Sequence, residues 1–264
     1  MKNLFFTLGL FTSLTFLLVS CKNETASNVK VPSTASTQLI DYPADLTKVF
    51  DNHGTLDKWK AMKSMTYEIV KEEGNEKQQI DLLNRSERID GSNFSSGYDG
   101  EKYWVVADTS YKGNAKFYTN LIFYFYAMPF VLADDGINYS KIDPLVFEGK
   151  SYPGYAISYN SGVGISPQDE YFIHYDPETY EMQWLGYTVT FFSGKKETKT
   201  SWIRYNDWKN FNGLKLPNSL SWYKTEEGKI TELRNTRNFT NVAVSSEAFP
   251  KGTLQMPEGA KEVE

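Results

Sequence analysis

The feature that most constrains the fold of this chain is an aromatic run in its middle, which occupies residues 117–132 and reads FYTNLIFYFYAMPFVL. Seven of its sixteen residues are Phe or Tyr. Asn114 before the run suits a helix N-cap, and Gly136 after it suits a left-handed helix stop. Apolar residues recur at helical spacing on more than one side of the run, which predicts a helix buried over most of its surface.

Burying this helix is a strong requirement on the rest of the chain. Each aromatic side chain buries ~200 Å², which at ~25 cal/mol per Å² gives ~5 kcal/mol as an upper bound. A membrane is a poor environment for the segment, because its uninterrupted apolar part, residues 121–132, is too short to span a bilayer and contains Pro129. We therefore predict a bent helix that lies against a large curved sheet.

The chain after residue 43 is typical of short strands separated by tight turns. The strongest hairpin signal is at residues 99–100, Asp-Gly, and further turns are predicted at 176–177 and 212–213. Roughly eleven such strands with only two helical regions predict an antiparallel meander and not βαβ units. No linker interrupts residues 43–250. We therefore predict one domain, residues 43–264, of the mainly β (α+β) class: a curved sheet or half-barrel of about 11 strands with helices on its concave face.

One predicted strand, residues 181–192, is longer than its neighbours. Its apolar residues change parity between Trp184 and Tyr187. A glycine inside a strand often marks a bulge, so this change predicts a bulge at Gly186 that bends the sheet.

The first twenty residues have the features of a targeting segment. Lys2 gives a positive start, residues 4–19 are apolar, and residues 18–21, Leu-Val-Ser-Cys, resemble the lipobox of bacterial lipoproteins. The resemblance implies that Cys21 carries a diacylglyceryl group and an N-acyl chain, and two or three acyl chains anchor a protein stably. The alternatives are an ordinary signal peptide with a chance cysteine and a membrane-retained helix.

We therefore predict a lipoprotein signal peptide at residues 1–20 and a flexible, polar tether at residues 21–42 that follows the lipidated Cys21. Lys22 occupies the position where an Asp retains some lipoproteins in the inner membrane. The prediction is accordingly an outer-membrane anchor. The sequence leaves open whether the domain faces the periplasm or the exterior.

Composition excludes several classes of function. The formal net charge is −5 with no basic cluster, which argues against nucleic acid as a partner. One cysteine and two isolated histidines, His53 and His174, give little for a metal site, and we expect no metal, no other cofactor and no Ser-His-Asp triad. Ser193 and Lys196 have the Ser-x-x-Lys spacing of some acyl-transfer enzymes but fall in a predicted turn instead of at a helix start. We predict that the protein is not an enzyme.

Several short motifs resemble those of known envelope proteins. They are Gly-Tyr-Asp-Gly at 97–100 with Trp104 after it, Tyr-Asp-Pro with Thr at 175–179, Asn-Gly-Leu-Lys-Leu-Pro at 212–217, and His-Gly with the first Trp at 53–59. In this order the motifs resemble the outer-membrane lipoprotein carrier (LolA/LolB-like) superfamily, and most closely an uncharacterised family of bacterial envelope lipoproteins. The resemblance implies an eleven-stranded half-barrel with helices over its concave face that binds acyl chains or a hydrophobic partner. The soluble carrier has no lipid anchor, so Cys21 places this chain nearer the anchored receptor.

Eight aromatic residues are candidates to line a ligand cavity in that half-barrel. They are Phe123, Phe125, Tyr126 and Phe130 in the predicted helix and Trp104, Trp184, Trp202 and Trp222 in predicted strands. For each of them alone, a place in the core is the favoured explanation. As a set they predict an aromatic cavity, because a half-barrel with one helix rarely fills its own interior, and Tyr and Trp add polar tips.

Two hypotheses about function follow. In the first, the protein binds a lipid, an acyl chain or another apolar molecule in the cavity, as a carrier or receptor for lipids or lipoproteins. In the second, the cavity is filled by side chains and the protein is a non-enzymatic envelope scaffold that docks a protein partner. The sequence leaves the ligand and the oligomeric state open.

Overall fold

The computed structural model describes residues 42–160, 168–197 and 199–263. Tyr42–Glu264 forms one compact unit. The predicted signal peptide, Cys21 and the tether up to residue 41 lie outside the described residues, so their interpretation stays a prediction.

The described chain contains fifteen strands. The strands are β1 (Ser64–Ile69), β2 (Glu76–Asp81), β3 (Glu87–Asp90), β4 (Phe94–Tyr98), β5 (Tyr103–Ala107), β6 (Ile137–Phe147), β7 (Lys150–Tyr159), β8 (Tyr171–Tyr175), β9 (Met182–Tyr187), β10 (Ser201–Arg204), β11 (Trp208–Phe211), β12 (Leu214–Pro217), β13 (Ser219–Glu226), β14 (Lys229–Ser245) and β15 (Lys261–Val263). Thirteen of them form one open sheet in the order β15-β5-β4-β3-β2-β1-β14-β13-β10-β9-β8-β7-β6, and β11 pairs with β12. The pairings are antiparallel, which confirms the predicted mainly β fold with a large curved sheet.

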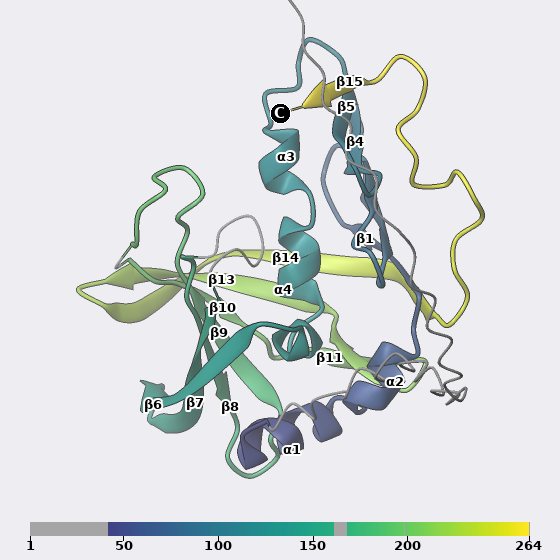
Figure 1. Ribbon diagram of the computed structural model, residues 1–264. Helices are drawn as coiled ribbons and strands as arrows, with labels where there is room; N and C mark the ends of the chain where they lie inside the picture. The colour runs from purple at the N-terminus through teal and green to yellow at the C-terminus, as the bar shows by residue number, and fades with distance from the viewer. Residues whose placement is uncertain (1–41, 161–167, 198, 264) are drawn as a thin grey trace, which may run out of the picture. The chain divides into compact units, whose positions relative to one another are not determined.

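Strand β14 joins two groups of strands that the chain builds separately. Its C-terminal part pairs with β1, so that Ser245 lies opposite Ser64, and its N-terminal part pairs with β13, so that Asn238 lies opposite Ser219. The group from β1 to β5 is a meander of sequence neighbours, and so is the group from β6 to β9. Figure 1 shows the long β14 running between the two groups.

The aromatic run is helical, but it is not the single bent helix that its spacing predicts. It forms α3 (Ala115–Tyr118), α4 (Leu121–Tyr126) and the 3-10 turn η1 (Phe130–Ala133). The predicted cap is confirmed, because Asn114 Oδ1 accepts from the Phe117 N–H at 3.0 Å. Asn120 has a left-handed conformation with φ 60°, which interrupts the helix between α3 and α4. The helical turns end at Ala133, before the predicted stop at Gly136.

Two further helices lie at the start of the domain, α1 (Ala44–Asn52) and α2 (Leu56–Lys60). The core combines the buried face of α1 with α4, η1 and one face of the sheet. Figure 1 shows α3 and α4 one above the other, with α3 beside β4 and β5 and α4 in front of β14. The prediction that the aromatic run is buried is confirmed for Ile122–Ala133 apart from Tyr124, which is half-buried.

The prediction of a bulge at Gly186 was wrong. Gly186 pairs in register with Phe172 on one side and with Trp202 on the other. The register shift on β8 lies instead between His174 and Tyr175. The long strand predicted over 181–192 also ends earlier, at Tyr187.

Candidate functional site

A cavity of about 290 Å³ lies between the helical run and the sheet. Its walls come from both groups of strands, so distant parts of the chain meet in it. Aromatic rings dominate the walls: Phe117, Tyr124 and Phe125 come from α3 and α4, Tyr98 and Tyr103 from β4 and β5, Tyr159, Tyr171 and Tyr187 from β7 to β9, and Phe191 from the segment after β9.

The strand tyrosines reach the cavity because successive side chains of a strand point to opposite faces. Tyr98 lies directly opposite Tyr103, with ring centres 4.7 Å apart. Tyr171 lies opposite Tyr187 in the β8–β9 pair, and its ring centre is 5.9 Å from that of Tyr159. The same alternation places these tyrosines on the face that carries the core.

The helical side of the cavity is built from Phe125 and Phe117. The Phe125 ring centre lies 4.7 Å from that of Tyr187 and 6.1 Å from that of Trp222. Trp222 supports this wall from behind, since its Nε1 donates to Tyr187 Oη at 3.1 Å. The Phe117 ring lies 5.0 Å from the Phe191 ring at the cavity edge.

One cation lines the cavity, and its charge is already paired. The Arg85 guanidinium donates through Nη2 to both carboxylate oxygens of Asp134, each at 2.9 Å. Its Nη1 donates to the Leu82 carbonyl at 2.6 Å, and the guanidinium carbon lies 5.2 Å from the Phe123 ring centre. Burial raises the pKa of Asp134, and the neighbouring Arg85 opposes that rise.

A second carboxylate, Asp169, also lines the cavity. Its Oδ1 accepts from the Thr190 backbone N–H at 2.6 Å. Burial raises the pKa of Asp169 above its usual value. Within residues 42–160, 168–197 and 199–263, none of the ion pairs includes Asp169. The described walls thus carry one paired cation and two carboxylates, of which one is paired.

A buried acidic pair lies close to the N-terminal end of α4. Glu87 is fully buried, and its Oε2 accepts from the Asn120 N–H. Burial raises the pKa of Glu87 to about 8, the Asn120 N–H opposes the rise, and nearby Glu76 adds to it. Glu76 accepts from the Tyr118 hydroxyl at 2.7 Å and pairs with Lys71. This pair ties α3 and α4 to β2 and β3 and does not line the cavity.

Of the eight predicted aromatic residues, Phe125 lines the cavity and Trp222 supports it. Phe123, Tyr126 and Phe130 are fully buried in the core instead. The Tyr126 ring contacts those of Tyr67 and Phe239, and the Phe130 ring stacks on Trp59 at 4.9 Å. Whether any of the eight binds a ligand stays a prediction.

The other three tryptophans lie on the opposite face of the sheet. Trp104 alternates with the cavity residue Tyr103, and Trp184 alternates with the core residue Leu185. Trp202 pairs with Gly186 and lies 5.7 Å, ring centre to ring centre, from His174. The structure therefore does not bring these three into the cavity.

The sequence interpretation did not select the tyrosines on β4, β5, β7, β8 and β9 as site residues. The sequence pattern that could have identified them is the two-residue period of a strand, since Tyr171 shares a face with Ile173 and Tyr187 shares a face with Leu185. A cavity-facing tyrosine and a core-facing isoleucine have the same pattern, so the period alone identifies the face and not the role.

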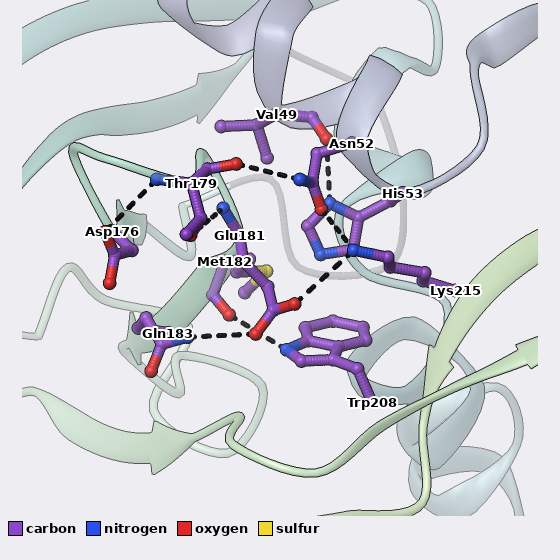
Figure 2. A network of polar contacts seen from close by, with 10 residues as sticks. All are labelled: Val49, Asn52, His53, Asp176, Thr179, Glu181, Met182, Gln183, Trp208 and Lys215. Carbon is purple, nitrogen blue, oxygen red and sulfur yellow. Dashed lines mark hydrogen bonds and ion pairs between the residues drawn. The ribbon is translucent and has the colours of Figure 1, made fainter.

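His53 belongs to a structural network at the end of α1. It caps the C-terminus of α1, and its ring forms a hydrogen bond through Nδ1 with the Val49 carbonyl at 2.7 Å. Burial lowers the pKa of His53 to about 4, with Lys215 adding to the effect. Figure 2 shows Lys215 between Asn52 and Glu181. Its Nζ donates to Asn52 Oδ1 at 2.8 Å and lies 3.5 Å from a Glu181 carboxylate oxygen, so α1 is tied to β12 and to the residue before β9.

His174 lies on the other face of β8 from the cavity. It is buried there, and its Nδ1 forms a hydrogen bond with the Tyr152 carbonyl at 2.9 Å. In the described part of the chain, no three His, Cys, Asp or Glu side chains gather in a way that would hold a metal ion. None of the helices in the described ranges combines the length and apolarity needed to cross a membrane.

Residues 101–236 match a protein family of unknown function, DUF6503, over more than half of the chain. The chain belongs to this family. The matched region contains α3, α4, η1 and most of the strands that wall the cavity. No curated protein matches the chain.

Solved structures with a similar outline come from bacterial proteins. A DUF1329 family protein from Desulfovibrio piger is 11% identical, with 74% of this chain and 91% of that chain covered and a TM-score of 0.44. A LolA superfamily protein from Nitrosomonas europaea is 8% identical, with 74% and 89% covered and a TM-score of 0.41. A putative outer membrane lipoprotein-sorting protein domain from Vibrio parahaemolyticus is 5% identical, with 75% and 93% covered and a TM-score of 0.39. At these TM-scores we draw no conclusion about function from the likeness.

Proposed function

We propose that this protein is a non-enzymatic, outer-membrane-anchored lipoprotein that binds a hydrophobic ligand, a lipid or an acyl chain, in the cavity between the helical run and the sheet. The observation that carries the proposal is the aromatic lining, to which both groups of strands and both helices α3 and α4 contribute. Ligand pockets are concave, largely apolar and provided with a few polar groups, and this cavity has all three properties. A role as carrier or receptor for lipids or lipoproteins is part of the same proposal.

The size of the cavity limits what it encloses. Its volume of about 290 Å³ is at the low end of the ~300–1,000 Å³ that is usual for ligand pockets. One acyl chain or one compact apolar molecule matches this volume. A lipid with two or three chains would keep part of its apolar surface outside, so a single-chain ligand is the better match.

The polar groups of the cavity support binding over catalysis. Thr119 Oγ1 donates to the Ala115 carbonyl at 2.9 Å, and Thr188 Oγ1 accepts from the Glu170 N–H at 2.9 Å. Neither histidine of the chain lines the cavity. A hydroxyl nucleophile needs an adjacent general base, and in the described residues neither hydroxyl forms a hydrogen bond with a His, Asp or Glu side chain.

The binding proposal is tested with a neutral, apolar fluorescent probe, N-phenylnaphthylamine, added to the mature chain without acyl groups. Val189 lines the cavity and is 38% exposed, whereas Val106 is 42% exposed on the opposite face of β5. Val189→Trp should reduce probe affinity about tenfold by filling the entrance, and the control Val106→Trp should leave affinity unchanged. No probe uptake by the unsubstituted chain, or equal losses in both variants, would contradict the proposal.

The membrane anchor is a separate part of the proposal. It is supported by the lipobox at residues 18–21 and by the absence of Asp after Cys21. Cells fed an alkyne-labelled fatty acid should incorporate label into the protein, and Cys21→Ala should abolish both the label and recovery in the outer-membrane fraction. Unchanged labelling of Cys21→Ala would contradict the anchor and leave the cavity proposal untouched.

A scaffold role is the second candidate, and one observation favours it. Phe192, beside the cavity residue Phe191, keeps 71% of its surface exposed, which is unusual for a large aromatic side chain. If a protein partner docks there, Phe192→Ser should abolish co-purification of that partner, while Val189→Trp should leave it intact. Loss of probe binding without loss of a partner would favour the ligand-binding role.

A further inference from the structure

The charges that line the cavity are not equivalent. The Arg85 guanidinium donates to the Asp134 carboxylate and to the Leu82 carbonyl, so few of its N–H donors are free to bind a ligand anion. Asp169 accepts a backbone hydrogen bond from Thr190 but belongs to no ion pair among the described residues. The described lining residues therefore present an unpaired negative charge and no unpaired positive charge to a ligand.

Tyrosine rings line the same cavity as this unpaired carboxylate. Tyr171 begins β8 two residues after Asp169. Burial raises the pKa of the Tyr171 phenol, and the Asp169 charge adds to the rise. Tyr187 lies opposite Tyr171, and Tyr159 lies beside it. The faces of such rings attract cations, by ~0.5–2 kcal/mol for each well-placed ring.

At the edge of the cavity, a cation of the protein already lies over one tyrosine ring. Lys116 places its ammonium 5.6 Å from the centre of the Tyr103 ring. Tyr103 thus has a cation–π contact within the protein. None of the described Lys or Arg side chains makes such a contact with Tyr159, Tyr171 or Tyr187. The rings near Asp169 are the ones left for a ligand.

We propose that the cavity selects apolar molecules that carry an organic cation, with the alkylammonium group between Asp169 and the rings of Tyr171 and Tyr187 and the apolar chain against Phe125. This inference rests on the proposed ligand-binding function and adds to it the charge class of the ligand. A carboxylate or phosphate in the same place would face Asp169 across a low-dielectric cavity, and like charges in such surroundings repel strongly. Arg237, a guanidinium outside the described ion pairs, lies over the Trp222 ring at 5.2 Å and does not line the cavity. Burial also raises the pKa of Asp169, and a bound cation would relieve that cost.

The test compares octyl ligands that differ only in their head group. Calorimetric titration of the unsubstituted mature chain with octyltrimethylammonium, octanol and octanoate should give the tightest binding for the ammonium and the weakest for the carboxylate, about tenfold between the extremes, or ~1.4 kcal/mol. Tetramethylammonium, which has the cation without the chain, tests the source of the ligand. If it binds as tightly as the octyl compound, the natural ligand is a soluble amine and the chain contributes nothing.

Substitutions at two adjacent residues test whether Asp169 is the residue that binds the ligand cation. Asp169→Asn keeps an oxygen for the Thr190 N–H and removes the charge, so most of the roughly tenfold preference for the ammonium over octanoate should be lost. The control Glu170→Gln removes the same charge from the adjacent residue, which pairs with Lys196 at 2.9 Å outside the cavity lining, and should leave the preference unchanged.

The outcomes separate this inference from the function on which it rests. If octanol, the ammonium and N-phenylnaphthylamine all fail to bind, the ligand-binding function itself is wrong. If octanol binds and octanoate binds as well as or better than the ammonium, the charge class is wrong and the binding function stands. The ligand comparison uses the unsubstituted protein, so it decides the question even if Asp169→Asn does not fold.

Discussion

At the scale of single residues, Gly186 leaves the space that the Trp202 ring occupies. A Cβ added at Gly186 would lie 2.9 Å from two atoms of that ring and 3.0 Å from the Thr200 methyl carbon. Trp202 in turn contacts His174 across the neighbouring strands. Gly186 therefore serves side-chain packing on the outer face of the sheet, and the regular register shows that it does not serve a bulge.

Gly186→Ala should lower the free energy of unfolding by about 1–3 kcal/mol, because the methyl group overpacks the Trp202 ring. Urea denaturation measures the change. In a Trp202→Leu background the same substitution should cost less than about 1 kcal/mol, because the ring that it meets is gone. An equal cost in both backgrounds would show that the ring is not the obstacle.

Glu87 makes stability depend on pH in a direction that is unusual for a carboxylate. Burial raises its pKa in the folded state from 4.5 to about 8, so the folded state holds the proton more tightly than the unfolded state does. The resulting stabilisation is complete below pH 4.5 and is lost as pH rises through about 8. At neutral pH and above, ionisation of Glu87 opposes folding.

Glu87→Gln should remove this dependence, since the amide keeps an oxygen for the Asn120 N–H and cannot ionise. The free energy of unfolding of the variant, relative to the unsubstituted protein, should rise by a few kcal/mol between pH 5 and pH 8, at ~1.4 kcal/mol per unit of pKa difference. Urea denaturation at the two pH values gives the difference. Glu73→Gln, at an exposed turn, is the control and should show no such change.

At the scale of elements, the helical run is fixed at both ends to the start of β3. Glu87 and the Arg85 carbonyl hold Asn120 at the beginning of α4, through its N–H and its Nδ2. The Arg85 side chain holds Asp134 just after η1. Glu87 at the start of β3 and Arg85 just before it therefore set the position of α4 and η1, and with it the shape of the cavity.

A double-mutant cycle of Arg85→Ala and Asp134→Ala measures how much the ion pair between these two residues stabilises the folded protein. The Asp134 side chain keeps 36% of its surface exposed, so we expect a coupling of about 1 kcal/mol, below that of a fully buried pair. Amide hydrogen exchange in α4 and η1 should accelerate in both single variants, since the helical turns lose their anchor. Additive effects on unfolding and unchanged exchange would contradict the connection.

The predicted and observed elements differ where local signals compete with packing. The Asn114 cap and the hairpin at 99–100 were predictable, because each depends on residues close in sequence. The break at Asn120 was not, because its partners Glu87 and Arg85 lie more than thirty residues away. The apolar pattern is continuous across the break, so helical spacing alone extends the helix through it.

At the scale of the whole molecule, the face that each strand turns toward the cavity depends on contacts between distant strands. Sequence alternation separates Tyr103 from Trp104 and Tyr187 from Gly186, but it does not say which of the two faces is covered by the helical run. Tryptophans are the larger residues and were the natural candidates for the inner face. The structure instead places Trp104, Trp184 and Trp202 outside and gives the inner face to tyrosines.

Because β14 is shared by the two groups of strands, they should unfold as one unit. Native-state hydrogen exchange with rising urea should give the same limiting free energy for amides of β2 in one group and β9 in the other. Two separate limits, differing by more than about 1 kcal/mol, would mean that the groups are independent domains joined by one long strand.

The pairing of Ser64 with Ser245 has a consequence for the order of events during synthesis, since 245 − 64 = 181 residues separate the two partners. At ~5–20 residues per second, β1 waits roughly ten to forty seconds for its second neighbour to be made. Throughout that interval one edge of the early meander lacks its hydrogen-bonding partner and is open to other chains. Contacts of such high sequence separation also slow the final closure of the sheet, so the early meander stays open to aggregation until the C-terminal part of β14 has paired with β1.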